Sequence, residues 1–488
     1  MKSRYLGILA PIACGLTTTA SAQSDSELRV YPVARELLYS AHNDAYTVRV
    51  RQPGEPWQDL YEYSVRVDTD TKQNASMVYF DFEGEVDVEV LVNNGTFTQV
   101  SVAPLSSEIT PERFGNVLRF RLTKPESFSL QFDDDRLHNL HILAGSLPAA
   151  RPEGENVRYF GPGQHVPPEG SDTFPVNSGD TIYMEGGAVM RGAFRLDNVR
   201  DVTIAGRGML WDPGQAIDLE RAENIRISDL ILVNSDRMPA ARVINIRNSE
   251  NVEVADITGF TSGKWSDGIN ISTSRHVTVD GGYLRVSDDA VVVYSVADCP
   301  LCRERAARTG IADPNPPGDT FDINVRDLRL WVDVAHALYI GHFGDNADPR
   351  TIRDVTFQNI DIANLDEDDP DWEGAMAIFS GDSTLIRNIT FNDIRVDRIE
   401  EGKLINIVAG NNQRYNKAPG RGIDGVTIRN VRYTGKGMPS MSILRGLSDE
   451  TAVRNVLIEN LAIDGTQVRT PEQANLEVSG AVSDLIIR

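Results

Sequence analysis

Three aspartates between Lys264 and Ser295 have the residue type and the spacing that acid–base chemistry needs. Asp267 belongs to an Asp-Gly pair, and Asp288 and Asp289 form a pair that leads directly into the apolar segment AVVVY. Carboxyl groups gathered at one place can supply the proton donor and the base that hydrolysis of a glycosidic bond requires. Each pair alone is more typical of a turn. Their separation by about one repeat of the surrounding pattern favours a common site.

A weak repeat after Val157 predicts the elements that position these aspartates. Segments such as DVTIAG, NIRISD, NVEVAD and HVTVDG alternate apolar and polar residues and end in Asn, Asp or Gly. This alternation predicts short strands, and no helical periodicity separates the segments. Strand repeats of this length are typical of a solenoid, so we predict an all-β parallel β-helix of about ten coils over residues 151–488. Stacked coils would place the three carboxylates on neighbouring rungs.

The longest interval between repeats lies between Val277 and Ile323 and indicates an insertion directly after the Asp-Asp strand. A long loop at this place would overhang the carboxylates, so we expect it to shape the site. The insertion contains Cys299 and Cys302. A local disulfide or two free thiols are favoured there over a redox site or a zinc site.

The residues before the repeat predict two further parts of the chain. Residues 1–22 combine Lys2 and Arg4 with an apolar run and an Ala-Ser-Ala triplet. This is the pattern of a cleaved signal peptide, and it predicts a secreted or periplasmic protein. Residues 23–150 contain several short alternating segments separated by turn residues. They predict an antiparallel β-sandwich in front of the β-helix.

The net charge of −23 limits the partners that the protein can bind. An acidic surface argues against nucleic acid and anionic membranes, and a neutral polysaccharide or oligosaccharide is an easier partner. No run after the signal segment is long enough for membrane insertion. We expect no cofactor and no bound metal. For the acidic stretch 366–371, a solvated loop is favoured over a calcium site.

The motifs around the aspartates resemble a known family. The segments WSDGINIST, VSDDAVVVYS and AHALYIGHFGD are similar, in the same order, to the NTDG, DD and GHG motifs of polygalacturonases, glycoside hydrolase family 28. The resemblance runs from about Asn198 to Asp361, and it implies a right-handed parallel β-helix, the pectin-lyase-like solenoid. The added β-domain in front is more similar to glycoside hydrolase family 49, which includes dextranase and isopullulanase.

Both families are inverting hydrolases, so the resemblance implies inversion with Asp288 as general acid. It implies Asp267 and Asp289 as the base pair that holds the attacking water, and it places the histidine of the GHG motif at His336. An inverting site needs room for this water, so its acid and base are expected about 6.5–9.5 Å apart, against about 5–5.5 Å in a retaining site. Two neighbouring carboxylates should raise the pKa of the acid.

Departures from the family 28 pattern bear on the substrate. Trp265 stands where that family has Asn, and alanines replace the two glycines beside His336. The R-I-K segment that grips the galacturonate carboxylate in family 28 has no counterpart in Ala375–Thr384, so bidentate carboxylate recognition is missing. We therefore predict a neutral α-linked glycan, with a dextran-like glucan favoured. The candidate substrate contacts are Lys264, Trp265, Tyr294, Trp331, His342, Trp372 and Arg414.

Other interpretations remain open at this point. The tryptophans could equally well pack in the core or at the rim instead of stacking on sugars. The first alternative function is a polygalacturonase-type pectin hydrolase. A polysaccharide lyase would need a base beside a uronate carboxyl group, often Arg or Lys with calcium, and no such cationic pair lies in the Asp-Gly and Asp-Asp coils. The last alternative is a carbohydrate-binding β-helix without catalysis.

Overall fold

The computed structural model describes residues 26–235, 239–296, 318–367, 374–437 and 439–488. The regular elements of these residues are all β-strands, and they form four sheets. The predicted signal segment and the two cysteines of the insertion, Cys299 and Cys302, lie outside the described residues.

Two sheets build the N-terminal part of the chain, and they pair antiparallel except where β11 runs parallel to β5. Alternate side chains of both sheets point inward, and Phe80, Val88 and Phe120 belong to one apolar core between them. This is the predicted β-sandwich. The six-stranded sheet contains β1 (Glu27–Arg29), β4 (Tyr63–Val67), β5 (Gln73–Glu83), β7 (Val100–Ala103), β10 (Glu126–Phe132) and β11 (Leu140–Ser146). The five-stranded sheet contains β2 (Tyr46–Arg51), β3 (Gln58–Asp59), β6 (Val86–Val92), β8 (Glu112–Phe114) and β9 (Val117–Leu122).

The remaining strands form a right-handed parallel β-helix, as predicted. The chain alternates between a 17-stranded sheet, which we call the long-strand sheet, and an 11-stranded sheet, which we call the short-strand sheet. The long-strand sheet contains β12 (Val157–Phe160), β13 (Gly163–His165), β15 (Thr181–Met184), β16 (Ala188–Met190), β18 (Arg200–Ala205), β19 (Met209–Trp211), β21 (Glu223–Ser228), β22 (Ile231–Asn234), β24 (Glu250–Thr261), β26 (Arg275–Val286), β28 (Thr320–Val332), β30 (Thr351–Asp366), β32 (Leu385–Glu401), β34 (Ile423–Gly437), β36 (Val453–Ile463), β37 (Thr466–Gln467) and β39 (Val482–Ile487). The short-strand sheet contains β14 (Thr173–Phe174), β17 (Ala193–Asp197), β20 (Ile217–Glu220), β23 (Ile244–Arg247), β25 (Ile269–Ser272), β27 (Val291–Tyr294), β29 (Leu338–Gly341), β31 (Met376–Ser380), β33 (Ile405–Ala409), β35 (Ser442–Gly446) and β38 (Leu476–Gly480).

The repeat in the sequence sets the register of the coils. Val252 pairs with Val277, which pairs with Ile323, which pairs with Val355, and all four side chains are buried in the core of the helix. The residue before each of these aliphatic side chains turns the chain with a positive φ, as at Asn251 with φ 56°. Asn and Asp tolerate this conformation better than other residues with a side chain, which explains why they recur at the corners.

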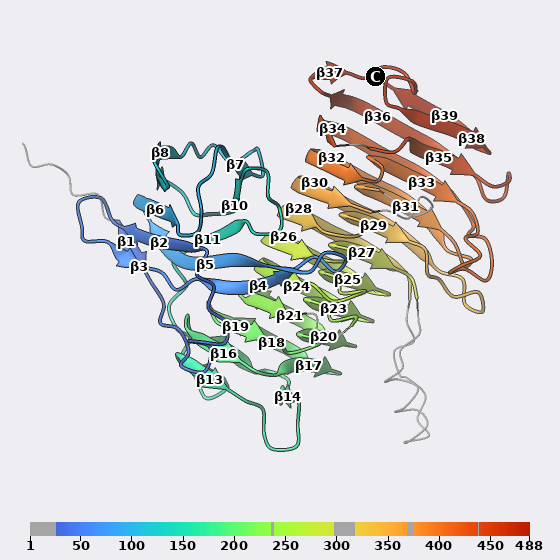
Figure 1. Cartoon of the computed structure of the whole chain (residues 1–488). Coiled ribbons are helices and arrows are strands. Elements are labelled where there is room, and N and C mark those ends of the chain that lie inside the picture. The colour runs from blue at the N-terminus through green and yellow to red at the C-terminus, as the bar shows by residue number, and fades with distance from the viewer. Residues whose placement is uncertain (1–25, 236–238, 297–317, 368–373, 438) are drawn as a thin grey trace, which may run out of the picture.

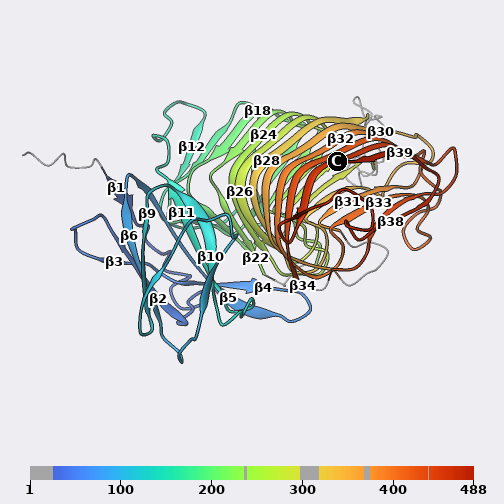
Figure 2. The same cartoon turned by 90° about the horizontal axis from the view of Figure 1, so that it is seen from above.

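The sandwich packs against the outer face of the long-strand sheet (Figures 1 and 2). Tyr63 and Tyr79 of the sandwich share one buried cluster with Trp211, Phe260 and Tyr283 of the helix. The short-strand sheet lies on the side of the helix away from the sandwich (Figure 1). One face of the helix is therefore covered within the chain, and the turns that lead into the short strands are left to build a site.

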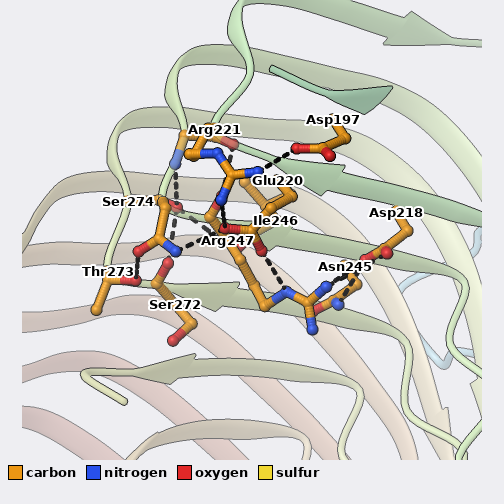
Figure 3. Close-up of polar contacts among 12 residues, drawn as sticks. Asp197, Asp218, Glu220, Arg221, Asn245, Ile246, Arg247, Ser272, Thr273 and Ser274 are labelled. Atoms are coloured by element: carbon orange, nitrogen blue, oxygen red, sulfur yellow. Dashed lines mark hydrogen bonds and ion pairs between the residues drawn. The ribbon is translucent and has the colours of Figure 1, made fainter. Parts of the chain in front are cut away.

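A buried polar network joins the coils that precede Asp267 (Figure 3). The guanidinium of Arg247 donates from Nη2 to both carboxylate oxygens of Asp218, at 3.2 and 3.3 Å, and its Nε lies 3.0 Å from Oε2 of Glu220. Asn248 donates to Oε1 of Glu220 at 2.7 Å. A buried ion pair is stable only when its remaining hydrogen-bonding groups are also satisfied, so this network is sensitive to the loss of any member.

Replacing Arg247 with methionine is expected to lower the free energy of unfolding by about 3 kcal/mol at neutral pH, because it removes the guanidinium from two buried carboxylates. Denaturant titration followed by circular dichroism measures the loss. The matched control is Arg226→Gln, whose exposed partner Glu253 lies 3.3 Å away, where a loss below about 1 kcal/mol is expected. Equal stability of the two variants would contradict the prediction.

Candidate active site

Neighbouring turns bring the predicted catalytic residues together. Asp267 lies just before β25, Asp289 just before β27 and His336 just before β29, and these three strands are adjacent in the short-strand sheet. Backbone hydrogen bonds join the turns, from Gly268 N to Asp289 O at 2.8 Å and from Ala290 N to His336 O at 2.9 Å. The stacking of the coils therefore places these three residues at the same position on consecutive coils, next to one another.

The three carboxylates lie closer together than predicted. Asp267, Asp288 and Asp289 each offer one oxygen within 4.8 Å of the other two, so the expected separation for an inverting site was wrong. The expectation assumed one acid facing one base across the sugar, whereas here all three groups share a single space. A water that accepts or donates two hydrogen bonds of about 2.7 Å joins oxygens up to about 5.4 Å apart. A single water can therefore hydrogen-bond to two of these carboxylates at once.

Asp289 is held as an ion pair with a histidine. Its Oδ1 lies 2.7 Å from Nδ1 of His336, and its Oδ2 accepts a hydrogen bond from the hydroxyl of Tyr294 at 3.2 Å. Burial alone would raise the pKa of this carboxyl, but the charge and the hydrogen bonds of His336 lower it below the usual value. Asp289 is therefore ionised at neutral pH.

Asp267 is held by two residues that the sequence analysis missed. Arg242 donates from Nε to Oδ2 of Asp267 at 3.0 Å, and Asn270 donates from Nδ2 to the same oxygen at 2.7 Å. Burial and the charge of Asp289 raise the pKa of Asp267 to about 6, and Arg242 opposes that rise. Asn270 stood in the predicted motif itself, three residues after the aspartate, whereas Arg242 is one coil away and only the register of the helix reveals it.

Asp288 has the opposite electrostatic environment. Its pKa is raised well above the usual value by burial and by the charges of Asp267 and Asp289. Its Oδ1 accepts a hydrogen bond from the backbone N–H of Asp289 at 3.0 Å. The site therefore contains one carboxyl group that keeps its proton near neutral pH beside two that give theirs up, which is the division that acid–base hydrolysis needs.

Replacing Arg242 with glutamine is expected to move the acidic limb of the pH profile of kcat/KM upward by about one unit, because a neighbouring cation lowers a carboxyl pKa by about that much or more. Asp267 must be ionised to act as a base, so a higher pKa means that activity is lost at a higher pH as the solution is made acid. Arg242→Lys should retain part of the wild-type profile. Arg226→Gln, at an exposed ion pair, is the control and should keep the wild-type profile. An unchanged acidic limb in Arg242→Gln would contradict the prediction.

Four of the predicted substrate contacts form two pairs of neighbouring side chains. Tyr294 and His342 lie at the site, since the Tyr294 ring centre is 5.9 Å from that of His342 and the His342 Nδ1 is hydrogen-bonded to the Tyr339 hydroxyl. Trp265 is 60% exposed, and Nζ of Lys264 lies over its ring, 4.6 Å from the ring centre. These side chains are placed where a bound glycan could reach them.

The other predicted contacts differ from one another. Arg414 lies over the ring of Tyr415 at 5.0 Å, and Tyr415 in turn contacts His342. The prediction for Trp331 was wrong: this side chain is 1% exposed and packs with Ala103 of the sandwich. The repeat does not reveal which outer face the sandwich covers. Trp372, like most of the acidic stretch 366–371, lies outside the described residues.

The sequence analysis also missed an apolar cluster beside the aspartates. Tyr339, Phe379 and Val408 project outward from consecutive short strands and form one buried cluster, with Tyr294 and Tyr415 packed against it. Each of these residues stands in an ordinary alternating strand, so the sequence shows their outward direction only once the coils are in register. The strand residues are nearly fully buried, so the partly exposed Tyr294 and Tyr415 are the members of the cluster on which a sugar ring could pack.

Three carboxylate oxygens within 4.8 Å of one another could in principle bind a metal ion. However, Arg242 already places a positive charge against Asp267, and the ring of His336 already occupies one oxygen of Asp289. This donor set suits proton transfer better than cation binding.

Among the described residues there is no helix long and apolar enough to cross a lipid bilayer.

Sequence comparisons match the chain to a known family and to one curated relative. The model of glycosyl hydrolases family 28 matches residues 169–481. A probable polygalacturonase of Arabidopsis thaliana is 20% identical over 253 residues, which are 51% of this chain and 49% of that protein. The chain therefore aligns with about half the length of this relative.

Two solved structures were matched over most of this chain. Dex49A from Penicillium minioluteum has a TM-score of 0.54 and 14% identity, and the likeness covers 92% of this chain and 95% of that one. The family 28 exopolygalacturonase of Yersinia enterocolitica has a TM-score of 0.49 and 11% identity, with 88% and 95% covered. The first likeness supports the fold. Because the family model matches well over half of the chain, the protein belongs to glycosyl hydrolases family 28.

Proposed function

We propose that the protein is a secreted, inverting hydrolase of an α-linked, uncharged polysaccharide or oligosaccharide, with a dextran-like glucan as the favoured substrate. The observation that carries the proposal is the division of charge among the three aspartates. Asp288 acts as the general acid toward the leaving oxygen, and Asp267 with Asp289 activates a water. His336 keeps Asp289 ionised and oriented.

The chemistry of the surface next to the aspartates supports an uncharged substrate. Strand β31 follows the His336 coil, and its outward side chains are Ala377 and Phe379. A uronate carboxylate would find no guanidinium or ammonium on this strand, and a neutral sugar would need none. Secretion is part of the proposal on the pattern of residues 1–22 alone.

A polygalacturonase is the second candidate. The family match and the Arabidopsis relative favour it, and one structural feature does so too. Lys403 lies one coil beyond β31, and its carbonyl oxygen accepts a hydrogen bond from Ala375 N at 2.8 Å. This buried side chain places one cation at this edge of the sheet, whereas the family 28 motif supplies paired cations.

A panel digestion distinguishes the two candidates. The purified mature protein is incubated with dextran, an α-1,3-glucan, a pullulan and polygalacturonate, and new reducing ends are measured. Release from a neutral α-glucan supports the proposal, and release from polygalacturonate alone overturns the substrate assignment. Formation of an unsaturated uronate would indicate a lyase. Binding without turnover that persists in Asp288→Asn would indicate a carbohydrate-binding solenoid.

The stereochemistry requires its own measurement. Proton NMR of the first-formed product should show the anomer opposite to that of the substrate. The carboxylate oxygens lie within 4.8 Å of one another, which is close to the spacing of retaining enzymes, so this experiment is decisive. Retention at the anomeric carbon would indicate that a carboxylate attacks the sugar directly instead of activating a water. This result would contradict the inverting mechanism.

A further inference from the structure

A buried ion pair lies behind the catalytic turns, at the contact between the sandwich and the helix. Arg285 on β26 is 0% exposed and donates from Nη2 to Oδ1 of Asp333 at 3.0 Å and from Nε to Oδ2 at 3.2 Å. Its guanidinium also lies over the ring of Trp331 at 4.7 Å. Such a pair is costly to bury unless its other hydrogen-bonding groups have partners.

The sandwich supplies those partners. Arg285 donates from Nη1 to Oδ1 of Asn139 at 2.6 Å and from Nη2 to the carbonyl oxygen of Arg136 at 2.8 Å. Its Nη1 also lies 3.2 Å from Nε2 of His141. The backbone N–H of Asp68 completes the network by donating to Asp333 at 3.0 Å. The pair is therefore satisfied only when the sandwich is in place.

The protonation of His141 fits this arrangement. Burial and the charge of Arg285 hold the pKa of His141 well below its usual range, so the ring is neutral. A neutral ring can accept the Arg285 hydrogen bond at Nε2 and donate from Nδ1 to the hydroxyl of Tyr283, which lies 2.7 Å away. Tyr283 belongs to the same strand as Arg285, so the histidine fixes β26 at two points.

The same pair lies within a few residues of both catalytic turns. Arg285 precedes Asp288 by three residues, and Asp333 precedes His336 by three. The backbone N–H of Asp333 donates to the carbonyl oxygen of Val286 at 2.8 Å. This hydrogen bond joins the two chain segments where they enter the turns. Any shift of Arg285 against Asp333 would therefore change the position of the acid relative to the histidine.

We propose that the sandwich is a positioning element of the active site, and that it acts through Arg285 and Asp333 to hold the Asp288 turn and the His336 turn in register. The inference rests on the proposed function, because it takes Asp288 as the acid and His336 as the partner of Asp289. Arg285 and Asp333 do not touch the substrate; they act through the two turns.

The interface offers a matched control far from the site. Arg207 donates from Nε to Oδ1 of Asp81 in the sandwich at 2.8 Å, and both side chains are buried. Arg207 lies between β18 and β19, several coils before the catalytic turns. Breaking this pair should destabilise the same contact between sandwich and helix without moving a catalytic residue.

The experiment compares Arg285→Met with Arg207→Met in the full mature chain. In Arg285→Met, kcat should fall about 10- to 100-fold with KM nearly unchanged, because misplacing a catalytic group by about 1 Å has this effect. Hydrogen–deuterium exchange should rise in peptides that cover residues 286–290 and 333–337. Arg207→Met should lose comparable thermal stability but keep its kcat and its exchange in those peptides.

A second variant covers the case in which Arg285→Met does not fold. Asn139→Leu removes one partner of Arg285 from the sandwich side and leaves the helix unchanged, so it should reproduce the selective exchange and a smaller fall in kcat. Equal effects of the Arg285 and Arg207 variants on kcat and on exchange would overturn the proposal. If exchange rises selectively in Arg285→Met but the wild-type protein hydrolyses no glycan, the positioning contact is supported and the proposed function is defeated.

Discussion

Replacing Asp288 with asparagine is expected to lower kcat about 10³- to 10⁴-fold, which is the upper range for the loss of a general acid. The amide has the shape of the protonated carboxyl group but cannot give a proton to the leaving oxygen. Activity on a substrate with a good leaving group should fall less, because such a substrate needs little protonation. Reducing-end assays on the natural polymer and on an activated aryl glycoside measure the difference.

The same substitution should leave folding intact and increase stability. The pKa of Asp288 is raised in the folded protein, so above the usual pKa of an aspartate the unfolded chain releases a proton that the folded chain keeps. This difference destabilises the native state as the pH rises. Asp288→Asn removes the penalty at neutral pH and has no such effect at a pH below the unfolded pKa. Asp280→Asn, on the exposed outer face beside Arg326, is the control for both measurements, and near-normal turnover in Asp288→Asn would remove the site itself.

Asp289→Asn is expected to lower kcat about 10²- to 10⁴-fold, because it removes a base and breaks the ion pair with His336. The effect should not add to that of Asp288→Asn. Once the acid is lost, the leaving oxygen is no longer protonated and activation of the water gains little, so the double variant should resemble the worse single variant. Full additivity of the two losses, measured as kcat/KM on one substrate, would show that the carboxylates act independently and would contradict the mechanism.

The order of strands and the position of the site could be predicted from the sequence because each coil repeats one local pattern. The aliphatic residue of each repeat lies where expected, and the coils align Asp267 with Asp289 and His336. What the pattern did not reveal were contacts between distant parts of the chain. Trp331 was wrongly assigned to the substrate. Its burial against Ala103 depends on how the sandwich packs on the helix, which the repeat does not show.

The missed residues have the same cause. Arg242 reaches Asp267 across one coil, and Arg285 reaches Asn139 across the contact with the sandwich. Neither arginine stands in a recognisable motif, and both have ordinary neighbours along the sequence. The separation of the carboxylates was wrong for a different reason: a rule derived from two facing groups was applied to three groups that share one space.

The coil that follows the catalytic pair shows how tolerant this architecture is of added chain. The longest insertion enters after β27, yet Val277 of β26 still pairs with Ile323 of β28, and Val291 of β27 pairs with Leu338 of β29. Because each rung is held by its own neighbours, the length of a turn is uncoupled from the register of the core. Loops at this edge can therefore be exchanged between related enzymes as separate modules, and substrate preference can be altered while the catalytic rungs stay where they are.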